Sequence, residues 1–396
     1  MLTPMSRLVR LGSRQGTGVD AVLTTTFASD DIVALRDALR GTLGTVWQEL
    51  PSTVETTWRE RWEPLAELGL PGFCVPEARG GFGLRVDAAV TAAMELGAAL
   101  HPSPFAGLTA SAHALAEAAQ SAETAQTAGA TGTGGDPVVG GLLDDIAAGA
   151  RICAFGRLGP DGRTARLVDG GPDADALLLL DRTRDELLLL ADPGDWSGEP
   201  SRHGFDITRT CADVTVTAGR GQRIAAPVHA DALYELLLAA DAIGGTQRAL
   251  DRTVAYTGQR QAFGRPIGGF QAVQHRLADH AVRVRGMALL VHEAARQFDA
   301  EPQSQEQAPS HAPSQAQEQA RARRIRRAVA LASLSVSSGA GHILHDLLQL
   351  TGAIGFTWEY GLHLYQRRVH QDARLAANPR AAARSLADTE GWTDAH

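Results

Sequence analysis

Apolar residues recur at three- and four-residue spacings near both ends of the chain, a pattern that predicts helices. One such series runs from Ile32 to Trp47 and another from Trp58 to Leu68. After Pro227 the same spacing returns, first from Leu233 to Val254 and then from Phe270 to Val291. Both ends of the chain are therefore predicted to be mainly helical.

Between these helical parts the pattern changes to short apolar runs. Ala176–Leu180 and Glu186–Leu190 are separated by a polar stretch that begins at Asp181. Two apolar runs with a short polar connection are typical of a β-hairpin. Val214–Thr217 adds a further predicted strand, so the middle of the chain is expected to form a small β domain.

These changes of pattern predict an α+β protein with four parts. A loose extension at 1–27 precedes an amino-terminal helical domain at 28–139. A middle β domain follows at 140–227, and a carboxy-terminal helical bundle occupies 228–396. Within that bundle, 301–319 is rich in Gln, Ser, Pro and Glu. Such a composition cannot bury a core, so a flexible excursion is expected there.

The charge of the chain excludes several kinds of partner. The formal net charge is −8 and the sequence pI is about 5.9, so bulk attraction to nucleic acid or anionic lipid is not expected. No uninterrupted apolar run approaches the length of a transmembrane helix. The 3 cysteines are widely spaced and are expected to be free thiols in a reducing cytoplasm.

The basic residues exclude further chemistry, because all 37 of them are arginine. Without lysine there is no Schiff-base catalysis, and the P-loop and kinase signatures cannot be completed. His342, His345 and Asp346 offer two ligands on one helix face but no placed third ligand, so no metal is expected. Chemistry must come from carboxylates, histidines, hydroxyls or a bound cofactor.

Three spaced motifs carry a resemblance to a known family. The segment from Gln259 to Asp279 contains R-Q-A-F-G-R-P-I, then F-Q, then L-A-D. Upstream, L-G-L-P-G begins at Leu68 and is followed by G-G-F-G and E-L-G. Downstream, Q-L-T-G-A-I-G-F begins at Gln349. The chain resembles the flavin-dependent acyl-CoA dehydrogenases, whose layout is a helical domain, a β domain and a four-helix bundle.

The resemblance implies FAD as cofactor and an acyl-CoA thioester as substrate. In the family, the residues matching Arg260 and Gln271 reach the flavin dinucleotide of a neighbouring subunit, and Phe263 would pack on it. Gln349 and Gly352 would lie along its far end. Arginine suits this role because its planar fork binds phosphate. The resemblance also implies a tetramer and electron-transfer flavoprotein as acceptor.

The sequence departs from the family where the catalytic base is expected. In the reaction a carboxylate removes an α-proton while a hydride passes to the flavin. The usual position of that glutamate falls near Ala376. A minority of the family places the base on the helix before the arginine motif, near Tyr234, next to Glu235. Glu235 is therefore the candidate base. The segment that normally holds the flavin ring also has no clear match.

These departures leave three hypotheses. The first is a self-sufficient FAD-dependent enzyme that desaturates an acyl-CoA in lipid or sterol side-chain catabolism. The second is the partner subunit of an α2β2 acyl-CoA dehydrogenase, because this chain resembles such actinobacterial subunits, in which one chain supplies the base and the other completes the flavin site. The third is a non-catalytic scaffold that has lost flavin.

Overall fold

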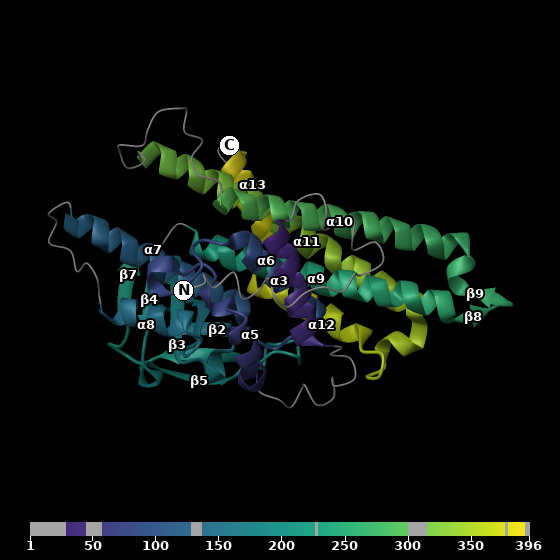
Figure 1. The fold of residues 1–396 in the computed structure, drawn as a ribbon, viewed down its shortest axis with the longest axis horizontal. Coiled ribbons are helices and arrows are strands. Elements are labelled where there is room, and N and C mark those ends of the chain that lie inside the picture. The colour runs from purple at the N-terminus through teal and green to yellow at the C-terminus, as the bar shows by residue number, and fades with distance from the viewer. Residues whose placement is uncertain are drawn as a thin grey trace.

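The computed structural model describes residues 29–44, 58–127, 137–225, 229–299, 315–376 and 379–392. The predicted extension at 1–27 and most of the predicted excursion lie outside these residues. The helices of 11 or more residues set the architecture shown in Figure 1. They are α3 (Asp30–Leu43), α6 (Val86–Ala98), α7 (Phe105–Thr127), α8 (Pro137–Ala147), α9 (Ala230–Gln259), α10 (Gln271–Asp299), α11 (Gln315–Thr351), α12 (Leu362–Leu375) and α13 (Pro379–Glu390).

Short elements fill the connections. They are α5 (Glu63–Glu67) and the 3₁₀ turns η2 (Trp58–Arg61), η3 (Leu70–Gly72), η4 (Glu77–Arg79), η5 (Gly171–Asp173), η6 (Pro193–Asp195), η7 (Ile267–Gly269) and η8 (Gly352–Phe356). The strands are β1 (Cys153–Arg157), β2 (Thr164–Asp169), β3 (Ala176–Asp181), β4 (Glu186–Leu190), β5 (Trp196–Pro200), β6 (Cys211–Val216), β7 (Gln222–Ala225), β8 (Gln261–Ala262) and β9 (Arg265–Pro266).

The middle of the chain forms two sheets, with strand orders β1-β3-β4-β7 and β2-β6-β5. The predicted hairpin is confirmed, because β3 pairs antiparallel with β4 in a register that joins Leu177 to Leu190. Leu177 and Leu179 pack in the core between the sheets, whereas Leu178 and Leu180 pack in the main helical core. Both faces are covered, which explains a continuous leucine run instead of an alternating one.

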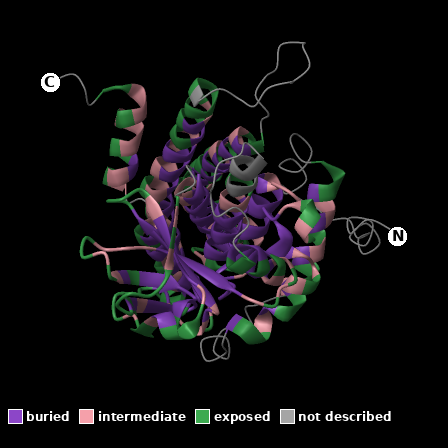
Figure 2. Cartoon of the chain, turned by 90° about the vertical axis from the view of Figure 1, so that its left-hand side faces the viewer, coloured by how far each residue is buried: buried purple, intermediate pink, exposed green. Residues whose placement is uncertain are grey.

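The expected α+β fold with two helical parts around a small β part is confirmed (Figure 1). Buried residues gather where the helices and sheets face one another (Figure 2). The amino-terminal helices contact α9 most closely through α6. A Cβ on Gly244 would come within 1.8 Å of the Met94 carbonyl oxygen, and one on Gly97 within 2.1 Å of the Asp241 carbonyl oxygen. The two backbones therefore meet without side chains between them.

Two segments differ from the sequence-based prediction. Residues 140–147, expected in the β domain, are helical and complete α8. The glycine pair at its centre hides the three- and four-residue spacing of Val139, Leu142, Leu143 and Ile146, all of which are buried. Residues 315–319, expected in the flexible excursion, form the first turn of α11. Alanine, glutamine and glutamate favour helix once a long helix follows them.

Candidate functional site

The turn between α9 and α10 has a fixed backbone conformation. The N–H of Arg260 donates to the Tyr256 carbonyl oxygen at 2.8 Å, and the N–H of Ile267 donates to the Arg260 carbonyl oxygen at 2.8 Å. Between them Phe263 and Gly264 adopt φ angles of 53° and 78°. Because positive φ is uncommon for a bulky residue, the turn holds Phe263 in a conformation that it rarely adopts.

The side chains of this turn face solvent. Arg260 is exposed, and its guanidinium has no hydrogen bond or ion pair among the described residues. Phe263 is 96% exposed, and its ring centroid lies 6.2 Å from that of Phe270. An exposed aromatic ring and an unpaired guanidinium in the same turn suit a ligand that is both flat and anionic. A dinucleotide with a pyrophosphate fits that description.

The remaining predicted cofactor residues are also exposed. Gln271 is the first residue of α10, and Gln349 lies in the last turn of α11. Gly352 begins η8 with a φ of 67°, and a Cβ there would meet nothing within 4 Å. Its requirement is therefore backbone conformation, not space.

Arg260, Phe263 and Gln271 thus share one turn, whereas Gln349 and Gly352 lie at the end of a different helix. Both groups lie toward the right-hand end of the bundle in Figure 1. Within the described ranges no hydrogen bond or ion pair joins one group directly to the other.

Contacts between the helices fasten the two groups in place. Asp346 of α11 accepts from Nε of Arg276 at 3.0 Å and lies 2.6 Å from Nε2 of His280, both on α10. Nη2 of Arg252 on α9 donates to the Tyr360 carbonyl oxygen at 2.8 Å. The hydroxyl of Tyr360 donates back to the Arg252 carbonyl oxygen at 3.2 Å. The bundle therefore supplies a rigid support for an exposed face.

Glu235, the candidate base, lies in the second turn of α9 and is engaged by arginines. Its Oε1 lies 3.2 Å from Nη2 of Arg157 and 3.6 Å from Nη2 of Arg182. Asp231, one turn earlier, pairs with the same two arginines. Burial raises the pKa of Glu235 to about 7, while Arg157 opposes that rise and Asp231 adds to it. The carboxylate is thus held in an ion-pair network at the start of α9.

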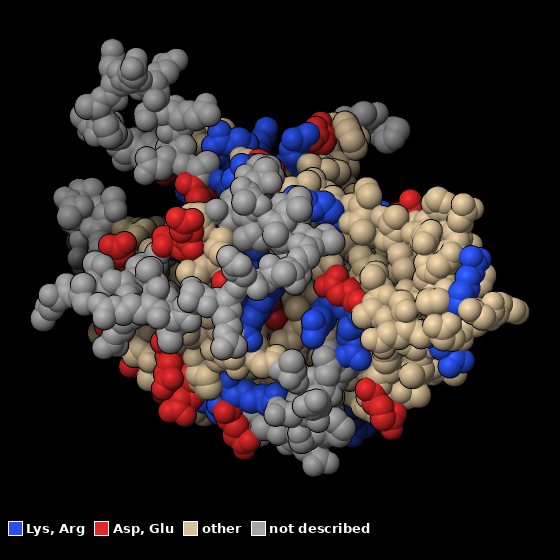
Figure 3. Space-filling model, turned by 45° about the vertical axis from the view of Figure 1, so that its right-hand side comes forward, with Lys and Arg blue, Asp and Glu red and all other residues tan. Residues whose placement is uncertain are grey.

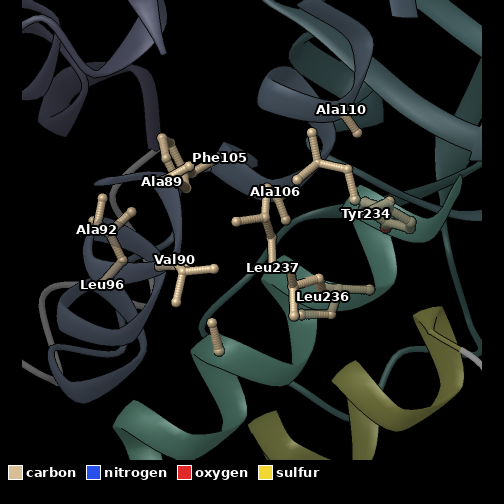
Figure 4. Close-up of a cluster of buried hydrophobic side chains, with 14 of the residues drawn as sticks. Ala89, Val90, Ala92, Leu96, Phe105, Ala106, Ala110, Tyr234, Leu236 and Leu237 are labelled. Carbon is tan, nitrogen blue, oxygen red and sulfur yellow. The ribbon is translucent and has the colours of Figure 1, made fainter. Parts of the chain in front are cut away.

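The neighbouring position, Tyr234, is buried at 2% exposure. Its ring lies 5.0 Å from that of Phe155, and the Arg157 guanidinium lies 5.4 Å from its centroid. Tyr234 lies at the edge of a cluster in which side chains of α6, α7 and α9 point toward one another, Phe105 and Leu237 among them (Figure 4). The space between α7 and the start of α9 is therefore closely packed.

The usual position of the base also lacks a carboxylate. Ala376 caps α12, and its N–H donates to the Asp372 carbonyl oxygen at 2.8 Å. Asp372 itself is buried, with its Oδ1 2.5 Å from Nη1 of Arg209. Neither position provides an acid that is free of an arginine.

Asp372 belongs to a buried ion cluster that sequence reasoning missed. Arg209 also reaches Asp241 at 2.7 Å and Asp169 at 3.7 Å. The second arginine, Arg368, is fully buried and forms the remaining contacts. Its Nε lies 2.5 Å from Asp206, its Nη1 lies 3.4 Å from Asp241, and both Nη atoms donate to the His101 carbonyl oxygen at 3.1 Å.

The ion cluster joins the three structural parts, because its members come from the loop after α6, from β2 and the β5–β6 connection, and from α9 and α12. Burial raises the pKa of Asp169 to about 6 and that of Asp372 well above its usual range. The cluster cannot be predicted from local spacing, because the paired residues are far apart in the chain and meet only in the folded protein.

The described residues contain neither a metal-binding cluster nor a membrane-spanning helix. No group of three or more His, Cys, Asp and Glu in that part of the chain could hold a metal ion. His342 and His345 are exposed, and Asp346 is taken by Arg276 and His280. Of the helices whose residues are described, none is both long and apolar enough to cross a bilayer.

Comparison with known proteins matches both helical parts. The acyl-CoA dehydrogenase N-terminal domain matches residues 29–128, and the acyl-CoA dehydrogenase C-terminal domain matches residues 235–377. The acyl-CoA dehydrogenase IpdE2 of Mycolicibacterium smegmatis is 31% identical over 330 residues, which are 82% of this chain and 86% of that protein.

Two solved structures share the fold. The Tcur3481–Tcur3483 steroid acyl-CoA dehydrogenase is similar with a TM-score of 0.73 and 22% identity, covering 93% of this chain and 99% of that one. The ChsE4–ChsE5 complex from Mycobacterium tuberculosis is similar with a TM-score of 0.69 and 21% identity, covering 94% and 99%.

Two helical parts around a two-sheet β part, with an exposed Arg-x-x-Phe-Gly turn at the end of the bundle, define the acyl-CoA dehydrogenase class of fold. The chain belongs to the acyl-CoA dehydrogenase family. It is accordingly an oxidoreductase of that family, and flavin is the family's cofactor.

Proposed function

We propose that this chain is the partner subunit of a heteromeric acyl-CoA dehydrogenase and that it completes a flavin site whose base comes from the other subunit. The observation that carries the proposal is that neither position at which the family places its catalytic base offers an unpaired carboxylate. Glu235 is ion-paired with Arg157, and Ala376 stands at the usual position. An α-proton must be removed by a carboxylate that can reach it. The pairing of Glu235 therefore favours a base from elsewhere.

The residues at the exposed end of the bundle fit a bound FAD. Arg260 would pair with the pyrophosphate, Phe263 would pack on the dinucleotide, and Gln271 would add a hydrogen bond. Gln349 and Gly352 would contact its far end. When bound, FAD accepts the hydride from the β-carbon of the acyl thioester. Because these side chains point outward, a flavin held by a neighbouring subunit suits them better than one held within this chain.

The solved relatives support a heteromeric assembly and suggest a substrate class. Two of them are named as pairs of proteins, Tcur3481–Tcur3483 and ChsE4–ChsE5, and the first is a steroid acyl-CoA dehydrogenase. We propose α,β-desaturation of a bulky acyl-CoA, in lipid or sterol side-chain catabolism, for the assembled enzyme. Electron-transfer flavoprotein as acceptor, an α2β2 tetramer and a cytoplasmic location belong to the same proposal.

The decisive experiment is to purify the chain alone and together with a co-expressed homologous dehydrogenase. Alone, it is expected to be colourless and inactive. Co-purified, the complex is expected to be yellow and to oxidise an acyl-CoA. A yellow chain that holds about one flavin per subunit and turns over by itself would refute the proposal. Failure to bind flavin with any partner would support a scaffold instead.

A second candidate function, the self-sufficient enzyme, rests on one specific observation. Burial raises the pKa of Glu235 to about 7, which is suitable for a general base. Under the partner proposal, Glu235→Gln leaves turnover of the co-purified complex within about 2-fold, because the residue serves only an ion pair. A loss of about 100-fold or more would identify Glu235 as the base. Asp231→Asn is the matched control, since Asp231 pairs with the same arginines.

A further inference from the structure

A cavity of about 570 Å³ lies between α3, α6, α9 and α10, and none of the candidate cofactor or base residues lines it. Its lining residues on α9 begin at Ile243, two turns beyond Glu235, which does not line it. Small-molecule sites have volumes of roughly 300 to 1,000 Å³. The cavity is therefore large enough for a compact ligand. Nothing in the proposed function uses it.

The charged residues of the cavity wall are five arginines and four carboxylates, the latter being Asp87, Glu95, Asp251 and Asp299. Figure 3 shows basic and acidic side chains around a hollow on one face of the molecule. Arg36 and Arg40 lie 3.6 Å and 2.9 Å from the carboxylate of Glu95. Arg248 and Arg285 are half-buried, and in the described part of the chain neither has a hydrogen bond or an ion pair. Neither guanidinium has a buried nitrogen that lacks a partner, so both still face water, which an anionic ligand could replace.

The acids of the wall do not neutralise these two arginines. Asp87 is paired with Arg85, which lies outside the cavity, at 3.0 Å. Asp251 accepts from Nε2 of Gln247 at 2.8 Å. Asp299 accepts from the N–H of Val86 at 3.4 Å, and burial raises its pKa to about 6. Each acid therefore has a partner of its own.

His292 lies on the cavity wall near three of the arginines. Burial lowers the pKa of His292 to about 4, and Arg36, Arg285 and Arg296 lower it further, in that order. A neutral imidazole at this place can donate or accept one hydrogen bond. Asp87 opposes these three guanidinium groups, whose combined effect on the imidazole is larger, so an anion bound beside His292 would be stabilised.

The rest of the wall is apolar. Ile32 of α3, Met94 of α6, Ile243 of α9, and Val284 and Ala288 of α10 line it. Apolar walls with a few convergent charges are the usual composition of small-molecule sites. The cavity therefore combines an anion-binding side with a side that excludes water.

We infer that this cavity binds an anionic amphipath, with a carboxylate or phosphate head between Arg248 and Arg285 and an apolar body against Ile243 and Val284. The planar guanidinium fork is suited to both kinds of head group. The head could belong to a free carboxylic acid or to the phosphates of a CoA thioester. Both share the chemistry of an oxyanion on an apolar chain. The inference stands apart from the flavin proposal, because binding here needs neither flavin nor turnover.

Calorimetric titration of the full chain, alone or with its co-purified partner, tests this site with three probes. Decanoate, decanoyl-CoA and decanol share one apolar chain and differ in the head. Decanoate or decanoyl-CoA is expected to bind, and decanol at least about tenfold more weakly, since it cannot pair with an arginine. Binding of decanoyl-CoA but not decanoate, when it is lost in the Arg248→Gln/Arg285→Gln double variant, would assign the head to a CoA phosphate at this site. Equal affinity for decanoate and decanol, or no binding of any probe, would overturn the inference.

Substitutions then place the bound anion. Arg248→Gln and Arg285→Gln are each expected to weaken binding of the anionic probe by about 10-fold or more, and the double variant to abolish it. Arg283→Gln is the matched control. Arg283 lies on α10, as Arg285 does, but it is exposed and does not line the cavity. The variants remove half-buried or exposed charges, so their melting temperatures should stay near that of the parent. Unchanged affinity in the folded double variant would refute the site.

Discussion

Arg260 and Arg265 both lie in the turn between α9 and α10, but their side chains have different surroundings. The Arg265 guanidinium stacks on Phe270, 4.0 Å from the ring centroid. The guanidinium of Arg260 has no partner among the described residues and is exposed. Arg265 therefore packs within the turn, while the guanidinium of Arg260 is available to a ligand. This difference gives the proposed pyrophosphate contact a clean test.

Arg260→Gln is expected to lower the flavin affinity of the co-purified complex by about 10- to 100-fold, because a charge-assisted hydrogen bond to phosphate is lost. Flavin released on dilution, followed by visible absorbance, measures the effect. Arg265→Gln serves as the control and should retain flavin. Equal flavin retention by the two variants would exclude Arg260 from the cofactor site.

At this scale the sequence predicted residue types better than their surroundings. The Arg260 motif could be recognised because its spacing is local. The engagement of Glu235 could not, because Arg157 and Arg182 lie about 80 and 50 residues earlier in the chain and reach it only after the sheet packs on α9. A candidate base can be named from a sequence, but its freedom to act depends on tertiary neighbours.

At the scale of elements, the contact between α6 and α9 depends on two glycines. Gly97 and Gly244 let the helix backbones approach so closely that any Cβ would overlap a carbonyl oxygen. The same helices form the inner wall of the arginine-lined cavity. Their spacing therefore sets the width of that cavity as well as the packing of the core.

Gly244→Ala is expected to destabilise the protein by at least about 3 kcal/mol, because its Cβ would lie 1.8 Å from the Met94 carbonyl oxygen and the helices would have to separate. Gly258→Ala on the same helix is the control. Its Cβ would meet nothing within 4 Å, so helix propensity should stabilise the protein by up to about 1 kcal/mol. Thermal unfolding distinguishes the two, and a similar melting temperature for both variants would contradict this account.

The hairpin of β3 and β4 could be predicted because two short leucine-rich runs separated by a polar turn are typical of paired strands. The helix α8 was missed because adjacent glycines interrupt its apolar spacing, although the surrounding packing stabilises it. Local pattern decided the first element, and tertiary contact decided the second.

At the scale of the whole molecule, the buried ion cluster is the point where all three parts meet. Arg368 contacts Asp206 in the β part, Asp241 on α9 and the carbonyl oxygen of His101 after α6. Removing one member of such a cluster leaves buried charges without partners. The cluster therefore couples the stability of the three parts.

Arg368→Met is expected to destabilise the protein by about 3 to 5 kcal/mol, since Asp206 and Asp241 would lose a fully buried partner. Arg276→Met removes an exposed ion pair with Asp346 and should cost less than about 1 kcal/mol. Urea unfolding of both variants measures the difference. A small effect at Arg368 would contradict the view that the ion cluster couples the three parts.

The bare ring of Phe263 also bears on how the protein is made in the cell. It stands 96% exposed, and Phe356 and Trp358 follow the end of α11 with 57% and 52% exposure. Where exposed apolar groups gather in one patch, they mark a surface that another chain covers, and an uncovered patch promotes aggregation. Under the partner-subunit proposal, a copy synthesised in excess of the proposed partner would be prone to removal by chaperones and proteases. We therefore expect its cellular abundance to follow that of its partner, so that deleting the partner's gene would deplete this chain without changing its messenger RNA.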